Sequence, residues 1–313
     1  MSNSGRQWAM AGLVLTTLFW AGNALVARGT SESIPPFALS FWRWLIPTIY
    51  LAPFTFRAVR RYRPILRAHW KQVIALAFFS VGAYNTILYL AAQSTGAINI
   101  ALVSSTMPLM IVLFSAIILR TLPHHRQLAG LILAFCGVLT ILTRANLDTL
   151  LNVNFNPGDL LMILSISSWA LYSVLLKRWP LDIPLFPLLC ILITLGTPMI
   201  LPFYLWELHN EGGFVLNVGN MSALLYVGTL PSVAAYFLWN NGVRTLGPGM
   251  AGLFAYLIPV FAALIAVPVL GESIEGYHAV GGLLVLAGLL AASRRPKSEI
   301  VADRLTRSQE GDR

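Results

Sequence analysis

The chain has 313 residues, of which 57% are apolar and only 11% are charged, and its mean hydropathy is +0.72. A soluble domain carries about 25% charged residues, so this composition excludes an ordinary soluble protein and indicates a membrane protein. The net charge of +9 follows the connections between apolar segments, so it indicates no nucleic-acid partner.

Ten apolar segments follow one another, each close to the roughly 20 residues that cross a bilayer as a helix. They cover 9–28, 36–56, 71–91, 97–119, 127–143, 159–178, 183–205, 221–240, 248–270 and 276–293. No alternating strand pattern of about 10 residues recurs, so the expected fold class is all-α with ten transmembrane helices. We interpret 9–28 as a permanent helix rather than a signal peptide, because only Arg6 precedes it and it has a counterpart later in the chain.

The basic residues lie on alternate connections between these segments. Of the 21 Lys and Arg residues, 18 fall near the N-terminus, on the even-numbered connections or after Ser293. Because positive charge concentrates on the cytoplasmic side of a membrane protein, both termini are expected to be cytoplasmic. The expected location is a bacterial-type inner membrane.

The second half of the chain repeats the first. At an offset of 149 residues Trp20 matches Trp169, and at an offset of 151 several Gly and Pro residues match in register over about 40 residues. These pairs are Gly96 with Gly247, Pro108 with Pro259, Gly130 with Gly281, and Gly137 with Gly288. The expected organisation is a five-helix repeat at 1–143, an external linker at 144–158, a second repeat at 159–293 and a disordered cytoplasmic tail at 294–313.

Each repeat has five spans, an odd number, so the second repeat enters the membrane from the opposite side. Inverted repeats of this kind occur in transporters, where the substrate site lies near the midplane between the two halves. The sequence therefore predicts a transporter with a central cavity that opens alternately to the two sides.

Three stretches resemble a known family. "FWAGNALVAR" (19–28), "PPFALSFWRW" (35–44) and "GPGMAGLFAYLIPVFAALIAVPVLGESI" (247–274) are similar to the EamA-type members of the drug/metabolite transporter superfamily. The resemblance covers 9–293. It implies transport of a small molecule, because relatives in that superfamily move amino acids, other metabolites and drugs, and it does not identify the substrate.

Polar and aromatic side chains inside the spans are the candidate substrate residues. Polar groups in hydrocarbon are costly and usually face the bundle interior. The candidates form matched sets in the two repeats: Trp20 and Asn23, Asn85 and Tyr89, Trp169 and Tyr172, and Tyr236 and Asn240. Weaker candidates are Tyr84, Trp239, Asn241, Asn99 and Tyr256. The alternative is that these side chains only join helices through hydrogen bonds.

Arg43 is the most unusual candidate. It lies in "FWRWLIP" (41–47), and no acidic residue at its depth is evident as a partner. We expect its guanidinium to bind an anionic group of the substrate, with Trp42 or Trp44 stacked against it. The alternative is that its long side chain reaches the outer headgroups.

Pro108 and Pro259 each lie near the middle of a span, where proline removes a helical hydrogen bond. We interpret them as gate hinges, with a fixed kink as the alternative.

Several types of chemistry are not expected. The acidic residues all fall in predicted loops, helix ends or the tail, so proton coupling through a mid-membrane carboxylate is not expected. The histidines lack metal-ligand spacing, and Cys136 and Cys190 fall inside spans, so we expect no metal, cofactor, disulfide or catalytic residue.

The expected function is a carrier of small metabolites, an exporter of amino acids or similar zwitterions. An exporter of drugs or lipophilic cations is the alternative within the same class, and a membrane-embedded enzyme or scaffold is the alternative from another class. We expect a monomer whose partners are a small-molecule substrate and the lipid bilayer.

Overall fold

The computed structural model describes residues 3–30, 32–270 and 274–293, and over these ranges it is helical, without strands. The helices of the first half are α1 Asn3–Gly29, α2 Pro36–Ala68, α3 Trp70–Ala77, α4 Tyr84–Ala92, α5 Ala97–Ser104, α6 Met107–Phe114 and α7 His125–Leu142. Those of the second half are α8 Leu147–Leu151, α9 Pro157–Arg178, α10 Leu185–Glu211, α11 Val218–Thr229, α12 Ala235–Leu246, α13 Pro248–Phe254, α14 Leu257–Leu270 and α15 Gly276–Ser293. Three π-helical turns interrupt the spans: η1 Phe78–Ala83, η2 Ser115–Leu119 and η3 Leu230–Ala234.

The all-helical membrane fold is confirmed. Nine helical stretches within the described ranges are long and apolar enough to cross a membrane. The stretch that is missing from this set is α2, which contains Arg43 and the prolines Pro47, Pro53 and Pro64. The count of ten spans therefore stays a prediction.

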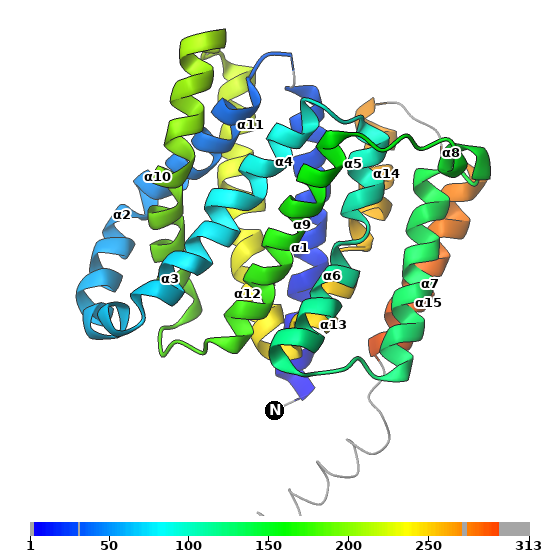
Figure 1. Cartoon of the computed structure of the whole chain (residues 1–313), viewed down its shortest axis with the longest axis horizontal. Coiled ribbons are helices and arrows are strands. Elements are labelled where there is room, and N and C mark those ends of the chain that lie inside the picture. The colour runs from blue at the N-terminus through cyan, green and yellow to red at the C-terminus, as the bar shows by residue number, and fades with distance from the viewer. Residues whose placement is uncertain (1–2, 31, 271–273, 294–313) are drawn as a thin grey trace, which may run out of the picture.

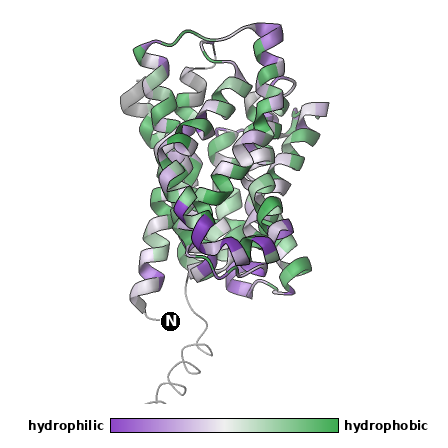
Figure 2. Cartoon of the chain, turned by 90° about the vertical axis from the view of Figure 1, so that its left-hand side faces the viewer, coloured by the Kyte–Doolittle hydropathy of each residue, from purple (hydrophilic) through white to green (hydrophobic). Residues whose placement is uncertain are grey.

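The helices run between two ends of one bundle. The N-terminal end of α1 and the C-terminal end of α15 lie at the same end (Figure 1), and the two pairs at the sides of the bundle are α7 with α15 and α2 with α10. Hydrophobic residues predominate along the middle of the bundle and hydrophilic residues gather at its ends (Figure 2). This distribution fits a bilayer around the middle of the bundle.

Helices α7 and α15 pack through reciprocal glycine contacts. A Cβ built on Gly130 would lie 2.4 Å from the Gly288 carbonyl oxygen, and a Cβ on Gly288 would lie 2.5 Å from that of Gly130. Gly137 and Gly281 make the same exchange at 2.6 Å in both directions. Because the earlier glycine of one helix meets the later glycine of the other, the two helices run antiparallel, as the matching helices of an inverted repeat must.

Adding a methyl group at this contact is expected to destabilise the protein. Gly281→Ala would place its Cβ 2.5 Å from Ile141 Cγ1 as well as against the Gly137 backbone, and such overpacking costs about 1–3 kcal/mol. The adjacent Gly282→Ala is a matched control, because its Cβ would meet only Val260 Cγ1 at 3.8 Å. Thermal unfolding in detergent should show a lower midpoint for Gly281→Ala alone; equal midpoints would contradict the close contact.

Both predicted proline sites coincide with breaks in a span. α5 ends at Ser104 and α6 begins at Met107, so Pro108 stands in the first turn of a new helix. Pro259 likewise stands in the first turn of α14, after α13 ends at Phe254. Proline is tolerated in a first turn, where its missing N–H has no helical acceptor. Each span is therefore interrupted by a short turn just before its proline, and the gate hinge and the fixed kink both stay hypotheses.

Two acidic side chains are buried among the described residues, and both lie at helix ends. Glu207, in the last turns of α10, accepts the backbone N–H groups of Phe37 (2.9 Å) and Ala38 (2.6 Å). It thereby satisfies two of the unpaired donors at the start of α2 and joins α2 to α10. The other buried acidic side chain is Asp159, in the first turn of α9.

Candidate functional site

Seven aromatic side chains from five helices meet at the centre of the bundle. They are Trp20 (α1), Trp44 (α2), Tyr84 (α4), Trp169 and Tyr172 (α9), and Tyr236 and Trp239 (α12). Trp169 occupies the middle: its ring centroid lies 5.3 Å from that of Trp20, 5.1 Å from Tyr84 and 4.9 Å from Tyr236. We call these seven side chains the central aromatic cluster.

The π-helical turns supply backbone acceptors to this cluster. η1 and η3 lie 152 and 151 residues apart at their first and last residues (78 and 230, 83 and 234), so they are matching features of the two halves. The Ser80 carbonyl oxygen in η1 accepts the Tyr236 hydroxyl at 3.1 Å, and the Pro231 carbonyl oxygen in η3 accepts Trp20 Nε1 at 3.0 Å. π turns occur frequently at functional sites because they shift backbone groups out of the regular ladder.

Arg43 is buried beside the cluster, with 3% of its surface exposed. Its Nε donates to Ser232 Oγ at 2.7 Å, its Nη1 to Asn23 Oδ1 at 3.2 Å and its Nη2 to the Pro231 carbonyl oxygen at 3.4 Å. Its Cζ lies 5.5 Å from the ring centroid of Trp44. The reading in which Arg43 reaches the headgroups is therefore wrong for this structure, since the side chain is enclosed by protein.

No acidic partner was expected for Arg43, and the described residues supply three uncharged acceptors to its guanidinium. None of these acceptors neutralises its charge. A guanidinium has five N–H donors, and the three contacts use one each, which leaves two. The three acceptors bind the other N–H groups of the guanidinium, so the two remaining donors are open to an anionic ligand.

A second polar contact crosses between α9 and α12. The Tyr172 hydroxyl donates to Asn240 Oδ1 at 2.8 Å, and both residues are buried. Four buried N–H groups at the centre have no partner among the described residues: Trp44 Nε1, Trp169 Nε1, Asn85 Nδ2 and Asn240 Nδ2. An unpartnered buried donor is costly unless a ligand or water accepts from it.

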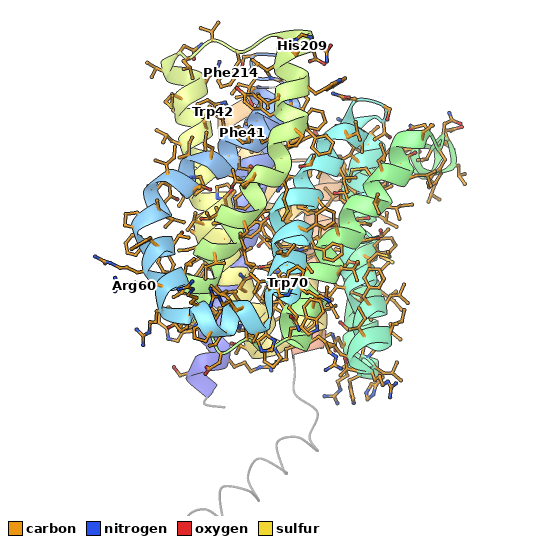
Figure 3. The ribbon with its side chains drawn as sticks, turned by 60° about the vertical axis from the view of Figure 1, so that its left-hand side comes forward. Phe41, Trp42, Arg60, Trp70, His209 and Phe214 are labelled. Carbon is orange, nitrogen blue, oxygen red and sulfur yellow. The ribbon has the colours of Figure 1, made fainter. Side chains whose placement is uncertain are left out.

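Tyr89 lies apart from the central aromatic cluster. It packs with Ile34, Ala38, Leu39, Leu224, Val227 and other residues in a separate apolar group near the start of α2. Phe41, Trp42 and Phe214 lie together at that end of the molecule, away from Arg60 and Trp70 (Figure 3). Asn85 and Tyr89 share a helix face, but four residues advance about 6 Å along the axis, so the two side chains reach different layers.

Asp159 joins the start of α9 to the turn between α4 and α5. It is 1% exposed and accepts hydrogen bonds from the Thr95 hydroxyl, from Asn99 Nδ2 at 2.9 Å and from the Asn156 backbone N–H at 2.9 Å. Asn156 Nδ2 also donates to Thr95 Oγ1 at 3.2 Å. We call Thr95, Asn99, Asn156 and Asp159 the α9 latch.

The aromatic rings pack against one another where the central cavity was predicted, and the cavity itself stays a prediction. Two cavities, of about 310 Å³ and 100 Å³, lie elsewhere in the bundle, and none of the nine predicted substrate residues lines either of them. The larger one lies at the end of the bundle that carries Arg6 and Lys177, so it is separated from the aromatic cluster along α9.

Sequence reasoning found Tyr84 and Trp239 only as weaker candidates and missed Ser232 and the Pro231 carbonyl. A hydropathy pattern does not indicate which backbone carbonyl groups lose their helical hydrogen bonds and can accept from a side chain. The available signal was Pro231 inside an apolar span, because proline disrupts the hydrogen bonding around it.

The chain shares sequence similarity with a known family of transporters. The EamA-like transporter family matches it twice, over residues 7–143 and 156–294. The chain belongs to the EamA-like transporter family. The predicted resemblance is therefore confirmed, and the two matches are close to the two predicted halves.

Two proteins that are similar to this chain are named as transporters, and their names state no substrate. An uncharacterized transporter of Archaeoglobus fulgidus is 29% identical over 88% of this chain and 94% of its own length. The uncharacterized transporter YyaM of Bacillus subtilis is 27% identical over 73% of this chain and 74% of its own. A crystal structure with 20% identity and a TM-score of 0.73 covers 97% of this chain and 99% of its own, which shows the same fold.

Proposed function

We propose that this EamA-like protein is an alternating-access carrier that exports small carboxylate-bearing metabolites, with amino acids and similar zwitterions as the substrate class. Arg43 carries the proposal, because it is a buried positive charge with uncharged partners and two remaining N–H donors. A carboxylate accepts two parallel N–H bonds from a guanidinium, which gives both affinity and orientation.

The surroundings of Arg43 support a substrate with an apolar or aromatic part beside its carboxylate. The rings of Trp20, Trp44 and Tyr236 lie next to it, and aromatic faces bind apolar groups through large contact areas. The unpartnered Asn85 Nδ2 and Asn240 Nδ2 would donate hydrogen bonds to further oxygen atoms of the ligand.

A lipophilic cation is the competing substrate, because aromatic rings also attract cations. The buried charge of Arg43 disfavours a second positive charge nearby, and the described residues place no acidic side chain in the central aromatic cluster to offset it. We therefore place zwitterions ahead of cations.

The proposal includes the organisation of the chain in the membrane. Two inverted repeats, 1–143 and 159–293, would be joined by an external linker at 144–158, and the tail 294–313 lies outside the described residues. Both termini would face the cytoplasm of a bacterial-type inner membrane. The antiparallel contact of α7 with α15 and the matching turns η1 and η3 support the repeat.

Counterflow in proteoliposomes tests the proposed function. Vesicles loaded with one amino acid at high concentration should accumulate trace radiolabelled amino acid from outside when they contain the protein. Vesicles loaded with a lipophilic cation should not accumulate labelled cation to the same degree. Accumulation of cations alone would favour the drug exporter, and no accumulation of any solute in the panel would contradict the carrier of zwitterions.

A further inference from the structure

The larger cavity, of about 310 Å³, has a lining that the aromatic site does not explain. Its basic side chains come from three helices: Arg6 in α1, Arg126 in α7 and Lys177 in α9. No acidic side chain lines it among the described residues. We call this cavity the basic pocket.

Two of the cations of the basic pocket, Arg126 and Lys177, lack an acidic partner among the described residues. Lys177 Nζ donates to the Arg244 carbonyl oxygen at 2.7 Å, a neutral acceptor. A cleft lined by charges of one sign concentrates ions of the opposite sign, because low-dielectric walls focus its field. The lining therefore fits an anion.

The smaller cavity lies at matching positions at the opposite end of the bundle, and its lining differs from that of the basic pocket. At the offset of 151, Val112 and Gln127 of the basic pocket match Ala263 and His278 of the smaller cavity. The described residues that line the smaller cavity are apolar apart from His278, and its volume is about 100 Å³. A hollow between helices is thus a product of the fold, whereas only one of the two linings, as far as the structure describes them, carries Lys or Arg.

The basic pocket also lies in line with the central aromatic cluster. Lys177 follows Tyr172 by five residues along α9, and Leu246 follows Asn240 by six residues along α12. At 1.5 Å per residue these separations are about 8–9 Å along the helices. The two helices joined by the Tyr172–Asn240 hydrogen bond therefore continue directly to the rim of the pocket.

We propose that the basic pocket is a second binding site, specific for an oxyanion such as a carboxylate or a phosphate group. A soluble anion and the phosphate of a lipid headgroup share this chemistry. The pocket would bind the substrate before or after the substrate occupies the central site, and this role rests on the proposed transport function. Binding of an anion to the pocket does not depend on that function.

Thiol labelling tests the oxyanion site without requiring transport. The reporter is Thr121→Cys, in the pocket lining, in a protein whose Cys136 and Cys190 are replaced by alanine and which is held in phosphatidylcholine nanodiscs. The probes are an anionic sulfonate and a cationic trimethylammonium methanethiosulfonate, each rate being divided by its rate with 2-mercaptoethanol. We expect the anionic probe to react about tenfold faster than the cationic one on this scale.

Matched variants identify the source of the selectivity. Arg126→Gln with Lys177→Gln should remove most of the preference for the anionic probe. Arg60→Gln with Arg63→Gln removes the same charge from exposed positions of α2 outside the pocket and should leave the preference unchanged. Equal rates for the two probes, or equal loss in both double variants, would overturn the proposal.

Two further experiments identify the anion that occupies the pocket, and a second cysteine covers the case in which the first one does not react. Inorganic phosphate at constant ionic strength should slow anionic labelling if the site takes soluble anions. Phosphatidylglycerol in the nanodisc should slow it if the site takes a lipid headgroup. Gln127→Cys provides a second reporter in the lining; failure of both reporters to react with the anionic probe would also overturn the proposal.

Discussion

Arg43→Ala is expected to reduce counterflow of zwitterions by about 100-fold. Hydrogen bonds to charged groups are worth about 1.5–3 kcal/mol, which corresponds to about 10- to 150-fold in affinity. In this chain the guanidinium is buried, and its three protein contacts leave two donors for a carboxylate. Arg43→Lys keeps the charge and loses the planar pair of donors, so it should retain part of the transport.

Two comparisons separate binding by Arg43 from support of the fold. Asn23→Ala is the matched control, since it removes the 3.2 Å contact to Arg43 and leaves the positive charge in place. Its zwitterion transport should fall less than that of Arg43→Ala. If Arg43→Ala transported zwitterions and cations equally well, or if its thermal unfolding midpoint collapsed while the few folded molecules kept normal affinity, Arg43 would be a structural residue.

Asp159→Ala is expected to open the end of the bundle that the α9 latch closes. The variant removes the acceptor of the buried Thr95 hydroxyl and one acceptor each of the half-buried Asn99 and Asn156, and a buried group left unpaired costs about 1–3 kcal/mol. At the matching position of the second half, residues 246–250 line the basic pocket instead of a latch. The two ends of the bundle therefore differ at matching positions: one carries the α9 latch, and the other carries the larger of the two cavities.

Labelling of a buried position reports this opening. Ala91 is fully buried, and a Cβ on Gly158 of α9 would lie 2.9 Å from its carbonyl oxygen. In a protein without native cysteines, an Ala91→Cys thiol should react with a membrane-impermeant maleimide about tenfold faster or more when Asp159 is alanine. Asp148→Ala, an exposed acidic residue of the same connection, should have no such effect. Equal rates in the two variants would show that the latch does not hold this end closed.

Much of the fold could be predicted from sequence because the bilayer constrains it strongly. Apolar length predicted the helical spans, and the offset of 151 singled out four glycines that turned out to pack α7 against α15. The offset gave the residues but not their partners: Gly130 matches Gly281 in sequence and contacts Gly288 in space. That exchange follows from the antiparallel orientation of matching helices.

The candidate site was harder to predict, because its geometry depends on departures from regular helices. The turns η1 and η3 free the Ser80 and Pro231 carbonyl oxygens, which hold Tyr236, Trp20 and Arg43. A 3.6-residue pattern contains no sign of such a turn. Arg43 was recognised as unusual because a buried cation is rare in a span, but two of its three neutral partners, Ser232 and Pro231, lie about 190 residues away in the sequence.

Counterflow of a zwitterion and of its carboxamide through the unmodified carrier is the most direct test of the central claim. The pair shares its amino group and side chain and differs in the carboxylate that Arg43 would bind. The account predicts accumulation of each transported amino acid and little or no accumulation of its carboxamide under the same conditions. Equal accumulation of both would contradict it, because a carrier that ignores the carboxylate does not use the charge of Arg43 to select its substrate.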